Sequence, residues 1–188
     1  MIFGMAIPSP FEKLLPLEGK FCAELENLSN NVARKISVSP ARGVDTTVRS
    51  TFLRWFLLEA IPSAAEPIAH VEIERAIFTE VLNLEATTTN LLLRFVECQF
   101  NEKIELSDAT LIGFEMVGGA AAEIIGDRLT VKGSMRLRRE RKPIPHDAPR
   151  IGTLRLCGAD IRGNLDMRGC FLLTKIAHST IAEGSGAS

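Results

Sequence analysis

Aromatic residues with a polar tip are scarce in this chain of 188 residues, which has one tryptophan and no tyrosine against ten phenylalanines. Nucleobases and sugars are commonly bound by stacking on such rings, so the composition does not favour a nucleic-acid or carbohydrate surface. No apolar run reaches the roughly 20 residues that a membrane-spanning helix needs. Residues 1–10 are without the basic start and small-residue cleavage site of a secretory signal. These absences predict a cytoplasmic protein.

Metal-binding patterns are also missing. The cysteines form no C-x-x-C pair and have no histidine partner at metal-ligand spacing, so the sequence predicts no zinc site. We expect reduced, mostly buried thiols. The four cysteines are Cys22, Cys98, Cys157 and Cys170.

Signatures of catalysis and cofactor binding do not occur either. There is no G-x-S-x-G, H-E-x-x-H or G-x-G-x-x-G, and the glycine pair at 158–163 is not followed by the Lys-Ser/Thr of a phosphate loop. His70, His146 and His178 are scattered, with no neighbouring nucleophile to activate. We therefore predict no catalytic residue, no metal ligand and no cofactor.

Residues 1–62 predict a helical N-terminal segment. Apolar residues recur at helical spacing within 11–28 and more clearly within 47–60, where Asp45 or Thr46 would supply the N-cap oxygen. The apolar face of the second helix carries Val48, Phe52, Trp55 and Phe56. We expect the three aromatic residues of this face to cover the start of the domain that follows.

From His70 onward, apolar and polar residues alternate, and the pattern repeats every eleven residues. The first members of the repeated apolar pairs include Val71, Leu82, Leu93, Ile104, Leu154 and Leu165. An eleven-residue unit is too short to bury its own apolar side chains, so stability has to come from stacking like positions into ladders. The repeat predicts a mainly β fold, a right-handed single-stranded β-helix (solenoid) of four to five coils behind an N-terminal α-helical cap.

The period also predicts which residues stack. If two units form one coil, residues 22 apart lie on adjacent coils, about 4.8 Å from each other. The outward residues between the apolar pairs then form ladders, with Glu72, Arg94 and Glu115 on one side and Asn83 and Glu105 on another. Opposite charges on neighbouring strands contribute about 0.2–1 kcal/mol each. We interpret these ladders as structure first and as a binding surface second.

The net charge of −1 hides an uneven distribution. Residues 66–127 carry twelve acidic and three basic groups, a net charge of −9, whereas residues 128–150 carry eight basic and two acidic groups, a net charge of +6. Three prolines oppose sheet pairing within 138–152, so this stretch predicts a basic insertion that protrudes from the solenoid. Its candidate contacts for an anion or an acidic partner are Arg138, Arg139, Arg141 and Lys142, together with Arg136 at its base.

The strings IELSDATL at 104–111 and LCGADIRGNL at 156–165 resemble the A-(D/N)-L-x-x consensus of pentapeptide-repeat proteins. The preceding helix and the eleven-residue spacing are more similar to a degenerate bacterial relative that is often labelled a membrane-associated oxidoreductase. The resemblance covers roughly residues 45–172. It implies a right-handed quadrilateral β-helix, and some members bind type II topoisomerases by mimicking DNA with a rod of negative charge. The looser register of this chain departs from the regular four-sided cross-section.

We divide the chain into a helical segment and cap at 1–62, a β-solenoid at 63–175 and a flexible tail at 176–188. The open end of the solenoid would carry Phe171 and Leu172. The leading hypothesis is a non-enzymatic scaffold or protein-interaction module, oligomeric through that end, with a protein partner or a second copy of itself and no nucleic acid. The alternatives are a DNA mimic that binds topoisomerase and an accessory domain of a membrane-associated oxidoreductase. A further alternative is that the basic insertion contacts an anionic membrane surface.

Overall fold

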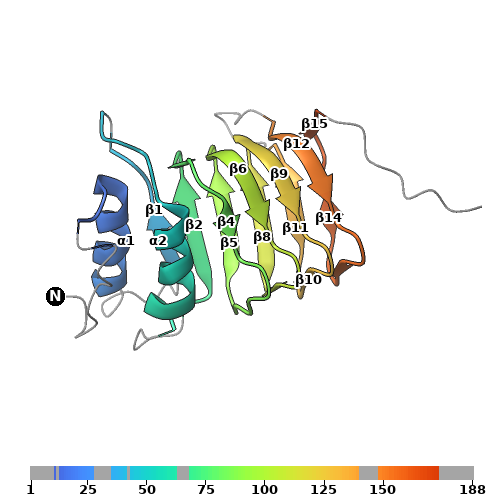
Figure 1. The fold of residues 1–188 in the computed structure, drawn as a ribbon, viewed down its shortest axis with the longest axis horizontal. Helices are drawn as coiled ribbons and strands as arrows, with labels where there is room; N and C mark the ends of the chain where they lie inside the picture. The colour runs from blue at the N-terminus through green and yellow to red at the C-terminus, as the bar shows by residue number, and fades with distance from the viewer. Residues whose placement is uncertain are drawn as a thin grey trace, which may run out of the picture.

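The structure is a computed structural model that describes residues 11, 13–27, 35–41, 43–62, 68–139 and 148–173. In this part of the chain the fold is mainly β, with two N-terminal helical elements followed by a stack of parallel strands (Figure 1). The predicted β-solenoid with N-terminal helices is confirmed. The handedness of the coil stays a prediction.

The strands form three parallel sheets. The first sheet contains β1 (Lys35–Val38), β2 (His70–Glu74), β5 (Leu92–Val96), β8 (Gly113–Val117), β11 (Met135–Arg138) and β14 (Leu165–Asp166). The second contains β3 (Ile77–Phe78), β4 (Leu82–Asn83), β6 (Gln99–Glu105), β9 (Ala120–Ile125), β12 (Arg150–Arg155) and β15 (Phe171–Leu172). The third contains β7 (Thr110–Leu111), β10 (Thr130–Val131) and β13 (Asp160–Ile161), and Thr88 extends it by one bridge to Thr110.

Each coil visits the three sheets in turn, so that a strand pairs with the equivalent strand of the next coil. Val71 pairs with Leu93, a step of 22 residues, as the repeat predicted. Leu82 pairs with Ile104 at the same step, but in the second sheet. The eleven-residue period therefore alternates between two sheets. Because β3 and β4 both pair with β6, which has a register shift in its middle, the four faces implied by the family resemblance appear as three sheets.

Inward apolar residues and outward polar residues alternate along strands such as β2, and the inward residues form the core. In β2, Val71 and Ile73 are buried in the lumen while Glu72, between them, points outward. Phenylalanines fill the same lumen, where Phe78 and Phe100 stack across adjacent coils with ring centroids 4.5 Å apart, and the ring of Phe95 meets Phe100 edge-on. Such contacts add to the burial of apolar area that stabilises each coil on its neighbour.

Small residues hold the corner between the first and second sheets. Cys98 is fully buried there, and its thiol donates to the Ile73 carbonyl oxygen at 3.3 Å. On the next coil Gly119, at φ +74°, lies so close that a Cβ at this position would be 2.1 Å from the Cys98 carbonyl oxygen. The corner therefore requires glycine at 119, both for its backbone conformation and for its lack of a side chain.

The N-terminal end is covered by helices. Helix α1 (Pro16–Asn27) presents Leu17, Phe21 and Leu25 as a fully or almost fully buried stripe, and it packs on β1. Along the solenoid axis α1 is outermost, and β1 and α2 lie between it and β2 (Figure 1). The Phe21 ring meets the Phe56 ring at 5.1 Å between centroids, which ties α1 to the second helical element.

The second helical element differs from its prediction in where it starts. It comprises α2 (Ser50–Trp55), continued by a π-helical turn, η3 (Phe56–Ala60). The residue at the N-cap is Arg49 and not Asp45 or Thr46. The reason is that the preceding backbone is used by the sheet: Ile77 N–H donates to the Thr46 carbonyl, and Val48 N–H donates to the Ile77 carbonyl. Asp45 instead accepts from Thr47 N–H in a local turn.

The coil interrupted by the basic segment keeps its register. β11 ends at Arg138 and β12 begins at Arg150, so the ladder resumes before the predicted boundary at 152. Steps across the interruption lengthen to 30 residues, as in the pairing of Met135 with Leu165. β12 nevertheless takes the position beside β9 in the second sheet, as β9 does beside β6 on the coil before.

Candidate functional site

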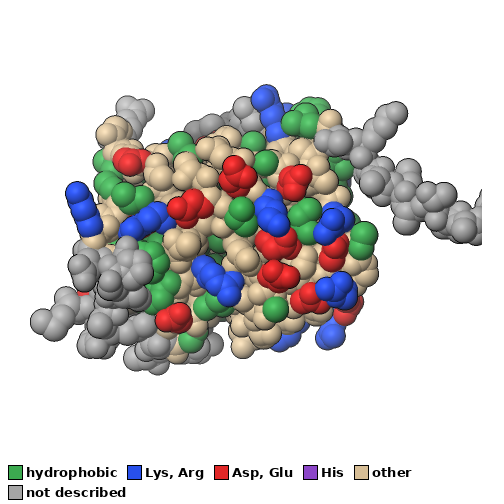
Figure 2. All heavy atoms as spheres, in the orientation of Figure 1, with side chains coloured by type: hydrophobic (Ala, Val, Ile, Leu, Met, Phe, Trp, Pro, Cys, Tyr) green, Lys and Arg blue, Asp and Glu red, His purple; other side chains and the backbone are tan. Residues whose placement is uncertain are grey.

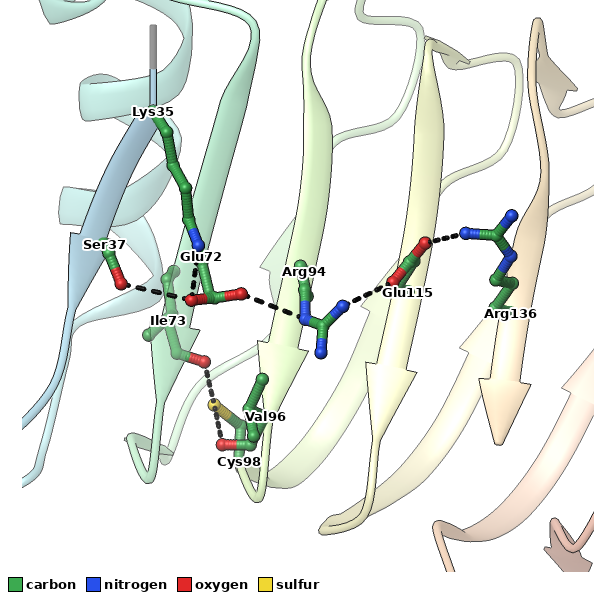
Figure 3. A network of polar contacts seen from close by, with 9 residues as sticks. All are labelled: Lys35, Ser37, Glu72, Ile73, Arg94, Val96, Cys98, Glu115 and Arg136. Atoms are coloured by element: carbon green, nitrogen blue, oxygen red, sulfur yellow. Dashed lines mark hydrogen bonds and ion pairs between the residues drawn. The ribbon is translucent and has the colours of Figure 1, made fainter. Parts of the chain in front are cut away.

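A row of polar and charged side chains crosses the outer face of the first sheet from β1 to β14. Strand pairing places Ser37 beside Glu72, Glu72 beside Arg94, Arg94 beside Glu115, Glu115 beside Arg136, and Arg136 beside Asp166. We call these six residues the charge ladder. The three members predicted from the sequence stack in the predicted order, and the structure extends the row by one strand at its start and two at its end. Figure 3 shows the row from Ser37 to Arg136.

The ladder is continuous in its contacts over its first five strands. Lys35 joins it from the side, with its Nζ 2.7 Å from Glu72 Oε1, and Ser37 Oγ donates to the same oxygen at 3.2 Å. Arg94 bridges two acids, with Nε 3.0 Å from Glu72 Oε2 and Nη1 3.1 Å from Glu115 Oε2. Arg136 Nη1 closes on Glu115 Oε1 at 2.5 Å. Each carboxylate thus contacts a cation on either side.

Glu115 is the most buried of the three carboxylates of the charge ladder. Only 4% of its side chain is exposed, and it lies between Arg94 and Arg136.

The pKa of Glu72 is set by opposing effects. Burial alone raises it, but hydrogen bonds from Lys35 and Ser37 and the charges of Lys35 and Arg94 bring it below its usual range. A partly buried charge of this kind contributes little net stability while it is paired. It becomes costly when its partner is removed, because an uncompensated charge is left behind.

At the far end of the ladder Asp166 is held by Arg168. Arg168 Nη2 lies 2.8 Å from Asp166 Oδ2, and Arg138 Nε approaches the same oxygen at 3.9 Å. The hydrogen bond from Arg168 lowers the pKa of Asp166 to about 2, with the Arg168 and Arg138 charges acting in the same direction. The ladder therefore ends on an acid whose main partner, Arg168, is 84% exposed.

The basic residues predicted to contact an anion are separated by the structure. Arg136 and Arg138 lie on β11, where their guanidinium groups pair with Glu115 and Asp166. Arg139 follows the strand and has contacts of its own. Arg141 and Lys142 lie outside the described residues. Arg136 is therefore a member of the charge ladder, and Arg138 lies on the same strand because β11 continues one residue into the predicted insertion.

The C-terminal coil, residues 156–173 with β13, β14 and β15, forms the other distinctive surface. Each of these strands is the last in its sheet and has a strand neighbour on one side only among the described residues. Leu165 is 47% exposed, Phe171 60% and Leu173 70%, the three highest values among the large apolar residues of the described chain. Phe171 points outward above Arg150, while Leu172 occupies the inward position above the buried Ile151. Both residues lie on β15, the last described strand of the second sheet.

Phe52, Trp55 and Phe56, predicted to cover the start of the solenoid, are buried in an aromatic cluster with Phe11 and Phe21. They are therefore unavailable as an exposed interface in this structure. The two ends of the solenoid differ accordingly, one covered by helices and one presenting apolar side chains.

A buried ion pair at the covered end was missed by the sequence reading. The Glu18 carboxylate is fully buried and accepts from Leu15 N–H at 2.9 Å, from Arg49 N–H at 3.0 Å and from the Arg49 guanidinium. Its bond back to Leu15 is half of a capping box, with the carboxylate three residues into the helix start. That spacing was the available signal, but nothing in the sequence linked position 18 to position 49.

Three further findings concern the residues that the structure describes. No group of three or more His, Cys, Asp and Glu side chains gathers there that could hold a metal ion. No helix in that part of the chain has the length and apolar character to cross a membrane. Burial raises the pKa of the Cys98 thiol to about 12 and that of Cys22 to about 11, so neither forms a thiolate near neutral pH.

Comparison with known proteins gives no relative: no protein-family model, curated protein or solved structure matches the chain. Inferences about function therefore depend on the two surfaces described above.

Proposed function

We propose that this chain is a non-enzymatic β-solenoid scaffold that binds a protein partner at its C-terminal coil. The observation that carries the proposal is the exposure of Leu165, Phe171 and Leu173 on the last strands of the stack. Exposed apolar patches mark interaction sites in soluble proteins, and free sheet edges offer backbone donors and acceptors to an added strand. Both kinds of group lie together at this end.

The charge ladder supports a scaffold role for the remainder of the solenoid. Its acids and bases neutralise one another along the row, and further pairs do so at the corners, such as Asp108 with Arg128 and Asp127 with Arg155. Acidic and basic side chains are interspersed over the face seen in Figure 2. A DNA mimic needs a long run of uncompensated negative charge, so this interspersion favours the scaffold over the DNA-mimic alternative.

Site-specific photo-crosslinking in the cells that naturally express the protein tests the proposal. A photoreactive amino acid replaces Phe171 in one variant and Ile112, an exposed apolar residue of an inner coil, in the matched control. We expect irradiation to give an adduct of one defined mass at 171 and none at 112. The adduct should also disappear when Leu173→Asp is added to the 171 variant. Equal labelling at both positions, or no adduct at 171, would contradict a docking role for this end.

A further inference from the structure

We propose that the partner of the C-terminal coil is a second copy of this chain, joined end to end about a two-fold axis perpendicular to the solenoid axis. This inference rests on the proposed function and names the occupant of the same surface. Three observations carry it: the asymmetry of the two ends, the charge of the open end, and the geometry of its strand edges.

The asymmetry of the ends selects the mode of association. A solenoid with two bare ends would stack head to tail without limit. Here α1 lies across the start, with Leu17, Phe21 and Leu25 turned inward, and β1 is the first strand of its sheet behind it. Among the described residues the covered start presents no exposed apolar cluster like that of Leu165, Phe171 and Leu173, so the like-for-like contact that the described residues offer joins the C-terminal coils of two copies. An interface of this isologous kind closes after two copies.

The charge of the open end is complementary to itself. The outward charged residues of its last strands and turns are Asp160, Arg162, Asp166 and Arg168, two acids and two bases. They form the pairs Arg162–Asp160 at 3.2 Å and Arg168–Asp166 at 2.8 Å. Arg162 and Arg168 are 62% and 84% exposed, so either can reach an acid across an interface while staying near its own. Two identical copies therefore meet without net repulsion, and each acid has a cation available from the other copy.

The strand edges fit the same axis. A two-fold axis perpendicular to the solenoid axis brings each sheet edge of one copy against an edge of the other in the antiparallel sense. Antiparallel strands exchange pairs of N–H···O bonds between opposite residues, so an edge can satisfy an identical edge. The same approach covers Leu165 and Leu172, which occupy inward positions that no further coil covers among the described residues.

Complementary charge variants of the full chain test this arrangement by sedimentation equilibrium. The acidic-end variant is R162E/R168E and the basic-end variant is D160K/D166N. We expect the unaltered chain to be a dimer, and each variant alone to dissociate at least about a hundredfold more readily, because like charges then face each other. An equimolar mixture of the two variants should regain the dimer. The matched control, R128E/R155E, makes the same charge change in ion pairs of inner coils and should remain a dimer.

The outcomes separate this inference from the proposed function. A monomeric unaltered chain at concentrations up to about 100 μM overturns the second-copy assignment, and so does a dimer that the acidic-end variant does not weaken. If the purified chain is monomeric but the photoreactive 171 variant still forms its adduct with a different polypeptide, the docking role stands and only the occupant is wrong. Far-ultraviolet circular dichroism of each variant must match the unaltered chain, and restored dimerisation in the mixture independently shows that both variants are folded.

Discussion

Arg49 and Glu18 meet at the junction of the two helical elements, where Arg49 Nη2 lies 2.5 Å from Glu18 Oε2 and Arg49 Nε lies 2.9 Å from Glu18 Oε1. The acid comes from the first turn of α1, and the base is the residue just before α2. The guanidinium also lies 5.1 Å from the centre of the Phe11 ring and donates to the Lys13 carbonyl. This pair fixes the position of the helix that covers the solenoid.

Replacing Glu18 by Gln should therefore loosen the covered end. The substitution keeps the size of the side chain but removes the charge that compensates Arg49, and breaking a buried pair in this way costs about 3 kcal/mol. Urea denaturation monitored by circular dichroism measures the free energy of unfolding. The control is Glu24→Gln on the exposed side of the same helix, which should change that free energy by less than about 0.5 kcal/mol. Equal effects of the two substitutions would show that the pair does not anchor α1.

The middle of the charge ladder makes a second prediction. In Glu115→Gln the side chains of Arg94 and Arg136 both lose their shared acid, and we expect the free energy of unfolding to fall by about 2–3 kcal/mol. The matched control is Glu102→Gln, an exposed acid on β6 of the second sheet. If Glu115→Gln lowered the free energy of unfolding no more than the control does, the charge ladder would have no part in holding adjacent coils in register.

A comparison of Gly119 with Gly43 distinguishes the cost of backbone strain from the cost of a steric clash. Gly119 and Gly43 share φ +74°, but a Cβ at 119 would lie 2.1 Å from the Cys98 carbonyl oxygen, whereas a Cβ at 43 meets nothing within 4 Å. Gly43→Ala should cost only the backbone term of about 1 kcal/mol. Gly119→Ala should cost considerably more, about 3 kcal/mol or above, because the two coils must move apart. Thermal unfolding of both variants measures the difference, and equal costs would contradict the close approach of the coils.

Acid should destabilise the protein in two stages. Glu18, Glu72, Glu105, Asp108 and Asp166 all have a pKa below the usual carboxyl range, owing mainly to hydrogen bonds from neighbouring bases and backbone that outweigh burial where burial occurs. A group whose folded pKa is lowered stabilises the fold above its unfolded pKa and loses that contribution as the pH falls. The main loss is therefore expected from about pH 4 downward, and the part due to Asp166 should persist to about pH 2.

His70 should add a smaller, earlier loss. Burial lowers its pKa below 6.5, together with the positive charges of Lys35 on β1 and Arg94 on β5, against the opposing effect of Glu72 and Glu115. The unfolded chain then binds a proton more readily than the folded one, so stability declines as the pH drops below about 6.5. Unfolding free energies at pH 7.5 and 5.5 should differ less in His70→Gln than in the unaltered chain. If the difference in unfolding free energy between the two pH values were the same in His70→Gln as in the unaltered chain, His70 would not be the group responsible for the loss.

The sequence predicted the axial order of the solenoid well because that order depends on a local, countable period. Val71 with Leu93 and Glu72 with Arg94 are pairs at a step of 22 residues, and both are found in the structure. The third sheet was not predicted, because the eleven-residue step alternates between the first and second sheets, and the pairing of Thr110 with Thr130 lies outside that step. The packing of α1 and its ion pair could not be predicted from the sequence either. The contact between Glu18 and Arg49 depends on how separate elements pack, and such a contact gives no periodic pattern in the sequence.

The misplacement of Arg138 has a related cause. A run of basic residues next to prolines predicts an exposed loop from 138 onward, but Arg138 is the last residue of β11 and pairs with Val117 of β8, just as Arg136 pairs with Glu115. Outward positions in the solenoid accept charged residues, and an acid on an adjacent coil lies near each arginine, Glu115 near Arg136 and Asp166 near Arg138. Only the position in the ladder, and not the local composition, distinguishes a ladder member from a loop residue.

The 30-residue step between Met135 and Leu165 has a consequence for how such a chain can change. β11 and β12 both keep the strand pairing of the preceding coil although the step is eight residues longer than 22. The connection after β11 therefore accepts additional residues without a change in strand pairing. It is therefore a suitable attachment point for a guest loop or a small grafted module. A chain of this architecture could acquire new peripheral parts there while its stacked interior stays the same.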